Sequence, residues 1–267
     1  MSKLGLIAGN RTFPLHVARA ARARGYEVIA IGLKEETDPA LEREVQKMHW
    51  VSLPEIGSVP TLLKKEQIRE LILAGQIRPE RLLAPERGFD GLVQQLFHWM
   101  PDRSGNSAMK MAVRFLESQG FRVLNSSIFL QEWIPSAGVL TQRPPTPQER
   151  QDAEFGVGLA RQLAGWSVGQ TVVVREKAVV AVEAMEGTDA AIRRAGQVAG
   201  PGCVAVKACE PNHDMRFDIP VIGPETLQAM KESGCGCLAV EAGRSLLFGR
   251  VRFLEEADRL RISVVAL

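Results

Sequence analysis

Charged side chains gather in one stretch of the chain, Cys203 to Pro224 (CVAVKACEPNHDMRFDIPVIGP). The apolar run CVAV is typical of a short buried strand, and charged residues follow where that strand should end. In chain order they are Lys207, His213, Asp214, Arg216 and Asp218. Ligand sites of α/β proteins lie outside the carboxyl ends of parallel strands. The stretch is therefore a candidate for chemistry, with carboxylates that suit a divalent cation and cationic groups that suit phosphate.

The backbone shape of residues 214–218 decides which chemistry is available. An extended segment would hold the carboxylates of Asp214 and Asp218 roughly 13 Å apart, too far for one metal ion. A helical turn would bring them to about 6 Å. Pro220 disfavours a helical conformation at the residue before it and so favours an extended end, but both shapes stay open. A solvated loop whose charges pair with one another is the plainer alternative.

Length and composition indicate a globular protein of two domains, with one large domain as the alternative. The 267 residues exceed the usual size of one domain. Hydrophobic residues make up 45% of the chain and charged residues 24%, as in ordinary globular proteins. The net charge of +2 gives no electrostatic case for nucleic-acid binding, so we expect no nucleic-acid partner.

The cysteines and the apolar runs predict a reduced, cytoplasmic protein. Cys235 and Cys237 are separated by one residue, which is not the spacing of zinc or redox motifs. We therefore expect free thiols at Cys203, Cys209, Cys235 and Cys237. No stretch of the sequence approaches the ~20 apolar residues of a transmembrane helix, and the first apolar run is too short for a signal peptide.

The first half alternates between strand and helix patterns. Residues 3–8 and 27–33 are predicted strands that flank a helix beginning near Phe13. The turn between them holds Gly9 and Asn10, whose backbone N–H groups at a helix N-terminus could bind phosphate. Further strands are predicted at 45–53, 68–75 and 121–125, and helices at 58–65, 90–99 and 107–118. This alternation predicts a Rossmann-like, mainly parallel sheet. An NAD-dependent oxidoreductase is disfavoured, because the G-x-G-x-x-G motif and the acidic residue after the second strand are missing.

A proline-rich stretch divides the chain. Its prolines, Pro144, Pro145 and Pro147, predict a linker of residues 135–150 between domains of residues 1–134 and 151–267. In the second domain we expect a helix at 147–163, a hairpin of strands 171–175 and 178–182, a helix after Thr188, strands at 203–206, 237–241 and 262–266, and helices at 225–233 and 250–260. The second domain is thus predicted to be a smaller, mixed α/β sheet.

Seven segments in chain order carry a family resemblance. They are LIAGN with a proline four residues on, AGQIRP, the GVL linker segment, VGQTVVV, EGTDA, KACEPNHDMRFDIPVIGPETL and LAVEAGRSL. Together they resemble the LpxI-type UDP-2,3-diacylglucosamine pyrophosphatases of lipid A biosynthesis, over nearly the whole chain. The resemblance implies a two-domain cytoplasmic hydrolase at the inner face of the inner membrane, with the substrate cleft between the domains. It also implies Mg²⁺-dependent hydrolysis of UDP-2,3-diacylglucosamine to UMP and 2,3-diacylglucosamine 1-phosphate.

The resemblance also implies which residues act. The essential aspartate is Asp214 or Asp218, and Lys207 and Arg216 would bind phosphate oxygens as catalytic residues. Such hydrolysis needs the charge on non-bridging oxygens neutralised and a water held in line. The residues expected to bind substrate are Gly9, Asn10, Gly75, Gln170, Gly187, Thr188 and Asp189.

Five carboxylates are candidate ligands for the implied Mg²⁺ or bases for water. Asp214, Asp218 and Glu186 are the expected metal ligands, followed by Asp189 and Glu241 as further candidates. Carboxylate oxygens are the ligands that Mg²⁺ prefers. Glu186 and Asp189 have a plainer role as caps of the helix that follows them.

The chain departs from the family pattern at three positions. Asn10 stands where a glycine is expected, and Asn106 and Ser107 stand where acidic residues are common. If those acids help to bind the ion, all metal ligands must come from the second half.

The alternative function is a nucleotide-sugar or lipid-phosphate binding protein without turnover. A homodimer and a peripheral contact with the inner membrane also remain open.

Overall fold

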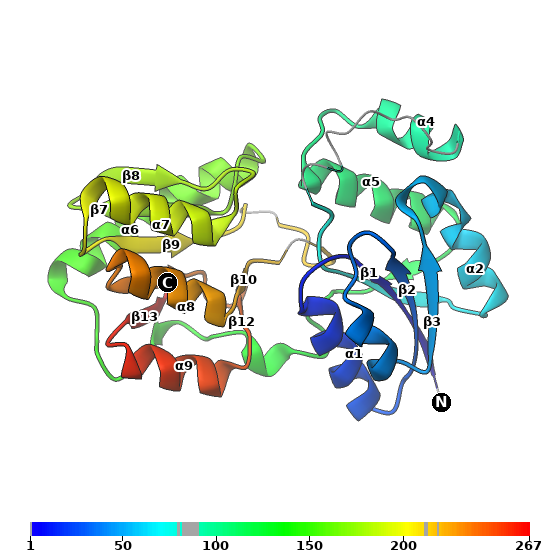
Figure 1. Cartoon of the computed structure of the whole chain (residues 1–267), viewed down its shortest axis with the longest axis horizontal. Helices are drawn as coiled ribbons and strands as arrows, with labels where there is room; N and C mark the ends of the chain where they lie inside the picture. The colour runs from blue at the N-terminus through cyan, green and yellow to red at the C-terminus, as the bar shows by residue number, and fades with distance from the viewer. Residues whose placement is uncertain (1, 79–80, 82–90, 211–212, 218) are drawn as a thin grey trace. The chain divides into compact units, whose positions relative to one another are not determined.

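The computed structural model describes residues 2–78, 81, 91–210, 213–217 and 219–267. These form two units, which are coloured along the chain in Figure 1. Unit 1 comprises Met1–Leu130 and Asp214–Asp218, and unit 2 comprises Gln131–His213 and Ile219–Leu267. Both units are α/β, which confirms the predicted fold class; the cleft between them stays a prediction.

Unit 1 is built on a five-stranded parallel sheet with the order β3-β2-β1-β4-β5. The strands are β1 (Lys3–Ala8), β2 (Glu27–Leu33), β3 (Lys47–Val51), β4 (Glu70–Ala74) and β5 (Arg122–Val123). This is the strand order of a Rossmann sheet, in which ligands bind where the order reverses, here between β1 and β4. The predicted Rossmann-like, mainly parallel sheet is confirmed.

Helices cover both faces of this sheet. They are α1 (Phe13–Ala23), α2 (Val59–Lys65), α4 (Gly91–Trp99) and α5 (Gly105–Ser118), with the short 3₁₀ helices η1 (Pro39–Glu44) and η2 (Leu53–Ser58). α1 packs on β1, β2 and β4. On the other face, Leu63 of α2 and Leu116 of α5 share a core with Ile31 and Leu71. Alternate side chains of each strand thus supply two separate layers.

Unit 2 contains a six-stranded mixed sheet with the order β6-β13-β11-β9-β7-β8. The strands are β6 (Gly138–Val139), β7 (Thr171–Arg175), β8 (Ala178–Val182), β9 (Val204–Lys207), β11 (Cys237–Val240) and β13 (Ser263–Ala266). β9, β11 and β13 are parallel, whereas β6 and β7 run antiparallel to their neighbours. A separate parallel pair joins β10 (Val221–Ile222) to β12 (Leu246–Leu247). The predicted mixed second sheet is confirmed, but it was expected to be the smaller sheet and has six strands against the five of unit 1.

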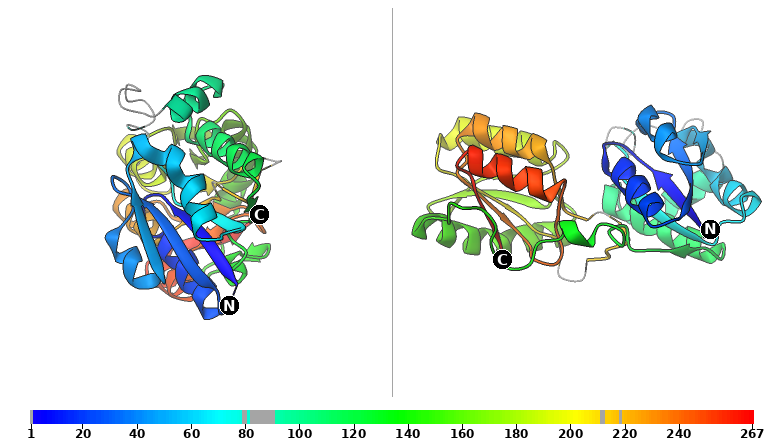
Figure 2. Two further views of the ribbon diagram at one scale, coloured as in Figure 1. Left: turned by 90° about the vertical axis from the view of Figure 1, so that its right-hand side faces the viewer. Right: turned by 90° about the horizontal axis from the view of Figure 1, so that it is seen from below.

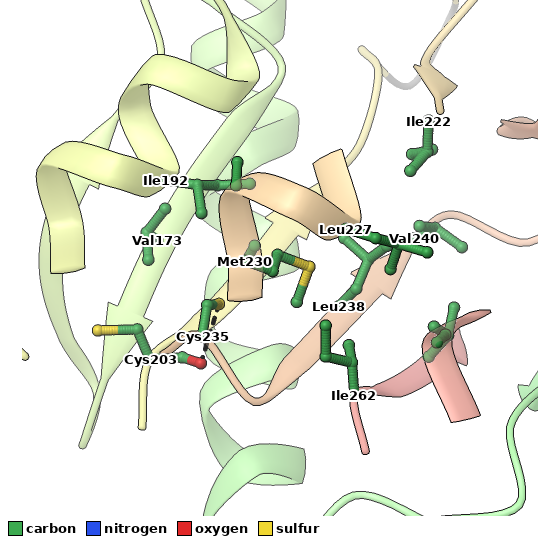
Figure 3. Close-up of a cluster of buried hydrophobic side chains, with 14 of the residues drawn as sticks. Val173, Ile192, Cys203, Ile222, Leu227, Met230, Cys235, Leu238, Val240 and Ile262 are labelled. Atoms are coloured by element: carbon green, nitrogen blue, oxygen red, sulfur yellow. Dashed lines mark hydrogen bonds between the residues drawn. The ribbon is translucent and has the colours of Figure 1, made fainter. Parts of the chain in front are cut away.

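The helices of unit 2 lie on opposite faces of its sheet, α6 (Pro147–Gly165) on one and three helices on the other (Figure 2). The three are α7 (Thr188–Ala199), α8 (Pro224–Ser233) and α9 (Arg250–Arg259). Figure 3 shows the larger core, in which Ile192 and Met230 of the helices pack over Leu238 of the sheet. The thiol of Cys235 donates to the carbonyl of Cys203 at 3.1 Å. All four cysteines are free and buried.

No helix within the described ranges is long and apolar enough to cross a bilayer.

The stretch expected to be a linker, residues 135–150, is bonded into unit 2. Within it, β6 pairs with β13, and the Thr141 hydroxyl accepts from the Val264 N–H at 2.9 Å. Arg143 binds both carboxylate oxygens of Glu149 at 2.9 Å and the carbonyl of Arg261 at 2.8 Å. The segment is therefore tethered on both sides of the prolines, since the residues before them bond to β13 and Arg143 bonds to Glu149 after them.

Residues 214–217 leave unit 2 and pack on unit 1, although the sequence placed them in the second domain. Phe217 is only 2% exposed and lies in the unit 1 core with Leu71 and Leu116. The N–H of Ser126 donates to the carbonyl of Met215 at 3.1 Å. The Phe217 N–H donates to the Asp214 carbonyl at 3.2 Å, so the segment is a turn. The extended shape is thus wrong for residues 214–217; Asp218 lies outside the described residues.

We predict that Phe217→Ala destabilises unit 1. Removing a buried phenylalanine costs about 3–5 kcal/mol, because a cavity is left where its ring packed. Hydrogen exchange of the β4 and α5 amides should show this loss. Phe155→Ala is the matched control, since Phe155 is 39% exposed on α6. Equal protection in both variants would show that Phe217 does not anchor the segment.

Candidate active site

One polar cluster of unit 2 lies along the edge at which β8 and β9 end and β7 begins. β7 starts at Thr171, which pairs in register with Lys207 at the end of β9. β8 ends at Val182, one residue before Glu183. Because β7 runs antiparallel to both strands, these positions meet at one edge. Glu183, Lys207, Thr171 and Thr188 form what we call the Lys207 cluster.

Lys207 is the centre of this cluster. Its side chain is 8% exposed, and its Nζ donates to the Thr188 hydroxyl at 2.6 Å. Thr188 in turn donates to Glu183 at 3.0 Å and accepts from Thr171 at 3.3 Å. The Glu183 carboxylate lies 4.0 Å from Nζ and also accepts from the Gln170 N–H at 3.3 Å. A buried ammonium needs such a counter-charge, because an isolated charge in a protein interior is costly.

The other predicted residues near the start of α7 bond elsewhere. Gly187, with φ of 85°, precedes the helix, and its N–H donates to the Ala184 carbonyl at 3.3 Å. Glu186 pairs with Arg194 at 2.6 Å. Burial acts to raise the pKa of Glu186, but hydrogen bonds from Arg194 and the Ala184 N–H leave it below its ordinary value. Asp189 accepts from the Thr226 hydroxyl at 2.9 Å, so neither carboxylate joins Lys207.

Glu241 occupies the same edge one strand further along, directly after β11. It is 3% exposed and accepts from Arg161 at 2.9 Å and from the N–H of Cys209 at 3.1 Å. Burial, together with this neighbouring carboxylate, raises the pKa of the Cys209 thiol to about 12. Glu241 is thus held as the partner of an arginine beside a protonated thiol.

In unit 1, Asp214 and Arg216 form a bidentate ion pair within the turn. Arg216 donates from Nη2 to Asp214 at 2.6 Å and from Nε at 2.9 Å, and its Nη1 bonds to Glu117 of α5 at 2.5 Å. The hydrogen bond to Asp214 raises the pKa of Arg216 above its ordinary value. Both side chains remain about one-third exposed, at 30% for Asp214 and 33% for Arg216. The pair is therefore oriented but open to a ligand.

Gly9, Asn10 and Gly75 meet where the strand order of unit 1 reverses. The N–H of Gly9 donates to Ala74 and that of Asn10 to Gln76, both at 2.8 Å. A Cβ on Gly9 would lie 2.4 Å from the Gln76 carbonyl oxygen, so only glycine fits there. Gly75 has φ of +83°. The two N–H groups expected to bind phosphate are therefore already bonded within the fold.

The expected metal ligands within the described residues belong to different units. Asp214 is paired with Arg216 in unit 1, and Glu186 with Arg194 in unit 2. Asp218, the third expected ligand, is outside the part of the chain that the structure describes. Elsewhere in that part, no group of three histidine, cysteine or acidic side chains could hold an ion. Two of the three expected ligands are thus held in ion pairs of their own units, and Mg²⁺ binding stays a prediction.

Two carboxylates were missed by the sequence reading. Glu183 lies in the Lys207 cluster, and the signal for it was a charged residue directly after the apolar strand 178–182. Glu36 has a fully buried carboxylate that binds Arg78 at 3.1 Å and accepts from Asn10 at 3.3 Å. Its partners lie at the ends of two other strands of unit 1, so no local pattern could have revealed it.

The geometry defines an α/β protein of two units, with polar groups at the carboxyl edges of both sheets. The chain belongs to the LpxI family: the LpxI N-terminal domain matches residues 3–133 and the LpxI C-terminal domain residues 136–265. It is 30% identical over 277 aligned positions to the UDP-2,3-diacylglucosamine pyrophosphatase LpxI of Caulobacter vibrioides, covering 99% of this chain and 97% of that protein. The family resemblance read from the sequence is confirmed.

Likeness to solved structures is weak. The biotin carboxylase subunit of pyruvate carboxylase is 10% identical with a TM-score of 0.29, over 75% of this chain and 43% of that one. The biotin carboxylase domain of Hydrogenobacter thermophilus 2-oxoglutarate carboxylase is 12% identical with a TM-score of 0.29, over 74% and 41%. The chain thus spans less than half of these solved chains, and they support no functional conclusion.

We predict that Glu183→Gln destabilises unit 2, because Lys207 then stays buried without its carboxylate. The expected loss is about 1–3 kcal/mol in the free energy of unfolding, measured by urea denaturation. Glu176→Gln is the control, since that side chain is 73% exposed and its ion pair contributes little. Adding Lys207→Met to Glu183→Gln should recover part of the loss. Equal stability of the two glutamine variants would contradict the pairing.

Proposed function

We propose that the protein hydrolyses the pyrophosphate of UDP-2,3-diacylglucosamine. Water would split the P–O–P bridge and release UMP and 2,3-diacylglucosamine 1-phosphate. The observation that carries this proposal is the match to the LpxI family along both halves of the chain, with a pyrophosphatase as the curated relative. The protein would then be a hydrolase of lipid A biosynthesis.

The residues of both units suit parts of this reaction. Lys207 is a cation at the edge of the unit 2 sheet, beside the start of α7, and both features favour a phosphate group. Arg216 presents a guanidinium, which pairs well with phosphate oxygens. Asp214 would orient the attacking water or accept its proton, since its carboxylate is partly exposed.

The proposal also includes Mg²⁺ as the cofactor and a cellular location for the enzyme. Bound Mg²⁺ would neutralise charge on the non-bridging phosphate oxygens. Asp214 and Asp218 are the carboxylates that we propose for it, because they lie four positions apart in the sequence. We also propose that the protein works in the cytoplasm at the inner face of the inner membrane, where an acylated substrate would be met. A homodimer stays a prediction.

We predict that the purified protein releases UMP from UDP-2,3-diacylglucosamine and that Asp214→Asn lowers turnover about 100-fold or more, as when one electrostatic group of a site is lost. Glu70→Gln is the control, because Glu70 forms an exposed ion pair with Arg122 at 2.9 Å. Circular dichroism should show both variants folded. Full turnover in Asp214→Asn would exclude its role. Saturable UDP binding without UMP would favour the binding protein without turnover.

We predict that chelation with EDTA abolishes UMP release and that added Mg²⁺ restores it. The reason is that two negatively charged phosphates must be approached by water, and a divalent cation lowers the barrier by neutralising them. The measurement is the initial rate of UMP release before EDTA, after it, and after Mg²⁺ is returned in excess. Unchanged turnover in EDTA would reject metal dependence while leaving the hydrolysis itself in place.

A further inference from the structure

An apolar cavity of about 140 Å³ opens in unit 1 at the carboxyl edge of its sheet. Its floor includes Ala8 and Gly9 at the end of β1 and Ala74 and Gly75 at the end of β4. Its walls come from η2, α2, the end of α4 and α5. The cavity therefore lies where the strand order reverses, which is the usual ligand position in such sheets.

The side chains around this cavity are almost all apolar. Half-buried members that face it are Ile56, Ile77, Met100, Met109, Met111 and Phe115. Among the lining residues that the structure describes, Gln76 has the one polar side chain and none is charged. Such a lining is typical of a site for an apolar ligand. Methionine adds adaptability, because its unbranched thioether fits irregular hydrocarbon surfaces.

A uracil, sugar or phosphate does not suit this cavity. Each would need hydrogen-bond partners, and a polar group buried without them is costly. Two backbone donors at this edge, the N–H groups of Gly9 and Asn10, already bond to Ala74 and Gln76. The turn that the sequence suggested for phosphate or uridine thus borders an apolar cavity.

We propose that this cavity binds an acyl chain of the diacylated substrate. The inference rests on the proposed function, which supplies a substrate with two such chains. A dry cavity of about 150 Å³ lined by similar side chains accepts a molecule the size of benzene, so this cavity holds a segment of on the order of six carbons. Unit 1 then binds hydrocarbon in this cavity, and the polar part of the substrate is assigned to the Lys207 cluster and to Asp214 and Arg216.

The first test is kinetic and uses a substitution that fills the cavity. Ala112 of α5 lines it, so Ala112→Phe should raise the KM for UDP-2,3-diacylglucosamine about tenfold or more, since excluding even two methylenes has that effect. kcat should change far less. Arg114→Phe is the matched control, because it adds the same ring at an exposed position of the same helix. Met111→Gln, which keeps side-chain length, should raise KM in the same direction if Ala112→Phe misfolds.

A second readout does not depend on turnover. The full chain is irradiated with a long-chain fatty acid that carries a diazirine at its tail, and labelled peptides are identified by mass spectrometry. We expect labelling within residues 53–60 and 105–118, and its loss in Ala112→Phe. Labelling of these segments without UMP release would contradict the proposed function but support the acyl site. UMP release with unchanged KM in Ala112→Phe and labels only elsewhere would overturn the acyl site alone.

Discussion

The burial of Phe217 constrains the whole candidate site. This side chain lies in the core of unit 1, whereas the chain on both sides of residues 214–218 belongs to unit 2. Asp214 and Arg216 sit in the same turn, and Arg216 also bonds to Glu117 of α5. The ion pair is therefore held by a hydrophobic anchor and an ionic contact to unit 1, while Lys207 is held by the sheet of unit 2. The charged residues between positions 207 and 218 are thus divided between the two units, although only twelve sequence positions hold them all.

Each sheet places a different kind of chemistry at its carboxyl edge. In unit 2 the edge is ionic, with Lys207 beside Glu183 and Glu241 beside Arg161. In unit 1 the edge is mainly apolar, because the tight contact between Gly9 and Gln76 uses the polar backbone groups there. A polar headgroup and a hydrocarbon tail require opposite surroundings. The ionic edge of unit 2 therefore suits a charged group, and the apolar edge of unit 1 suits a hydrocarbon group.

Sequence patterns predicted the elements better than the contacts between them. The strands at residues 3–8, 27–33, 171–175 and 178–182 have the predicted bounds, because an apolar run that ends in turn residues is a local signal. The two-residue strands β10 and β12 were missed, since they are too short to show a period. Lys207 and Thr188 were chosen from the sequence and do meet, but Glu183, which completes their cluster, was not. Partners across a sheet edge depend on strand order, which the sequence does not display.

The chain crosses between the two units more than once, and this has an evolutionary consequence. The polypeptide passes between the units after residues 130, 213 and 218, whereas the family's two domains divide once, between residues 133 and 136. A gene split at that division would yield a first product without the ring of Phe217 in its core and a second product with that ring exposed. Neither half is a module that can be exchanged with another protein. The two halves are therefore expected to be inherited together, as a single uninterrupted reading frame.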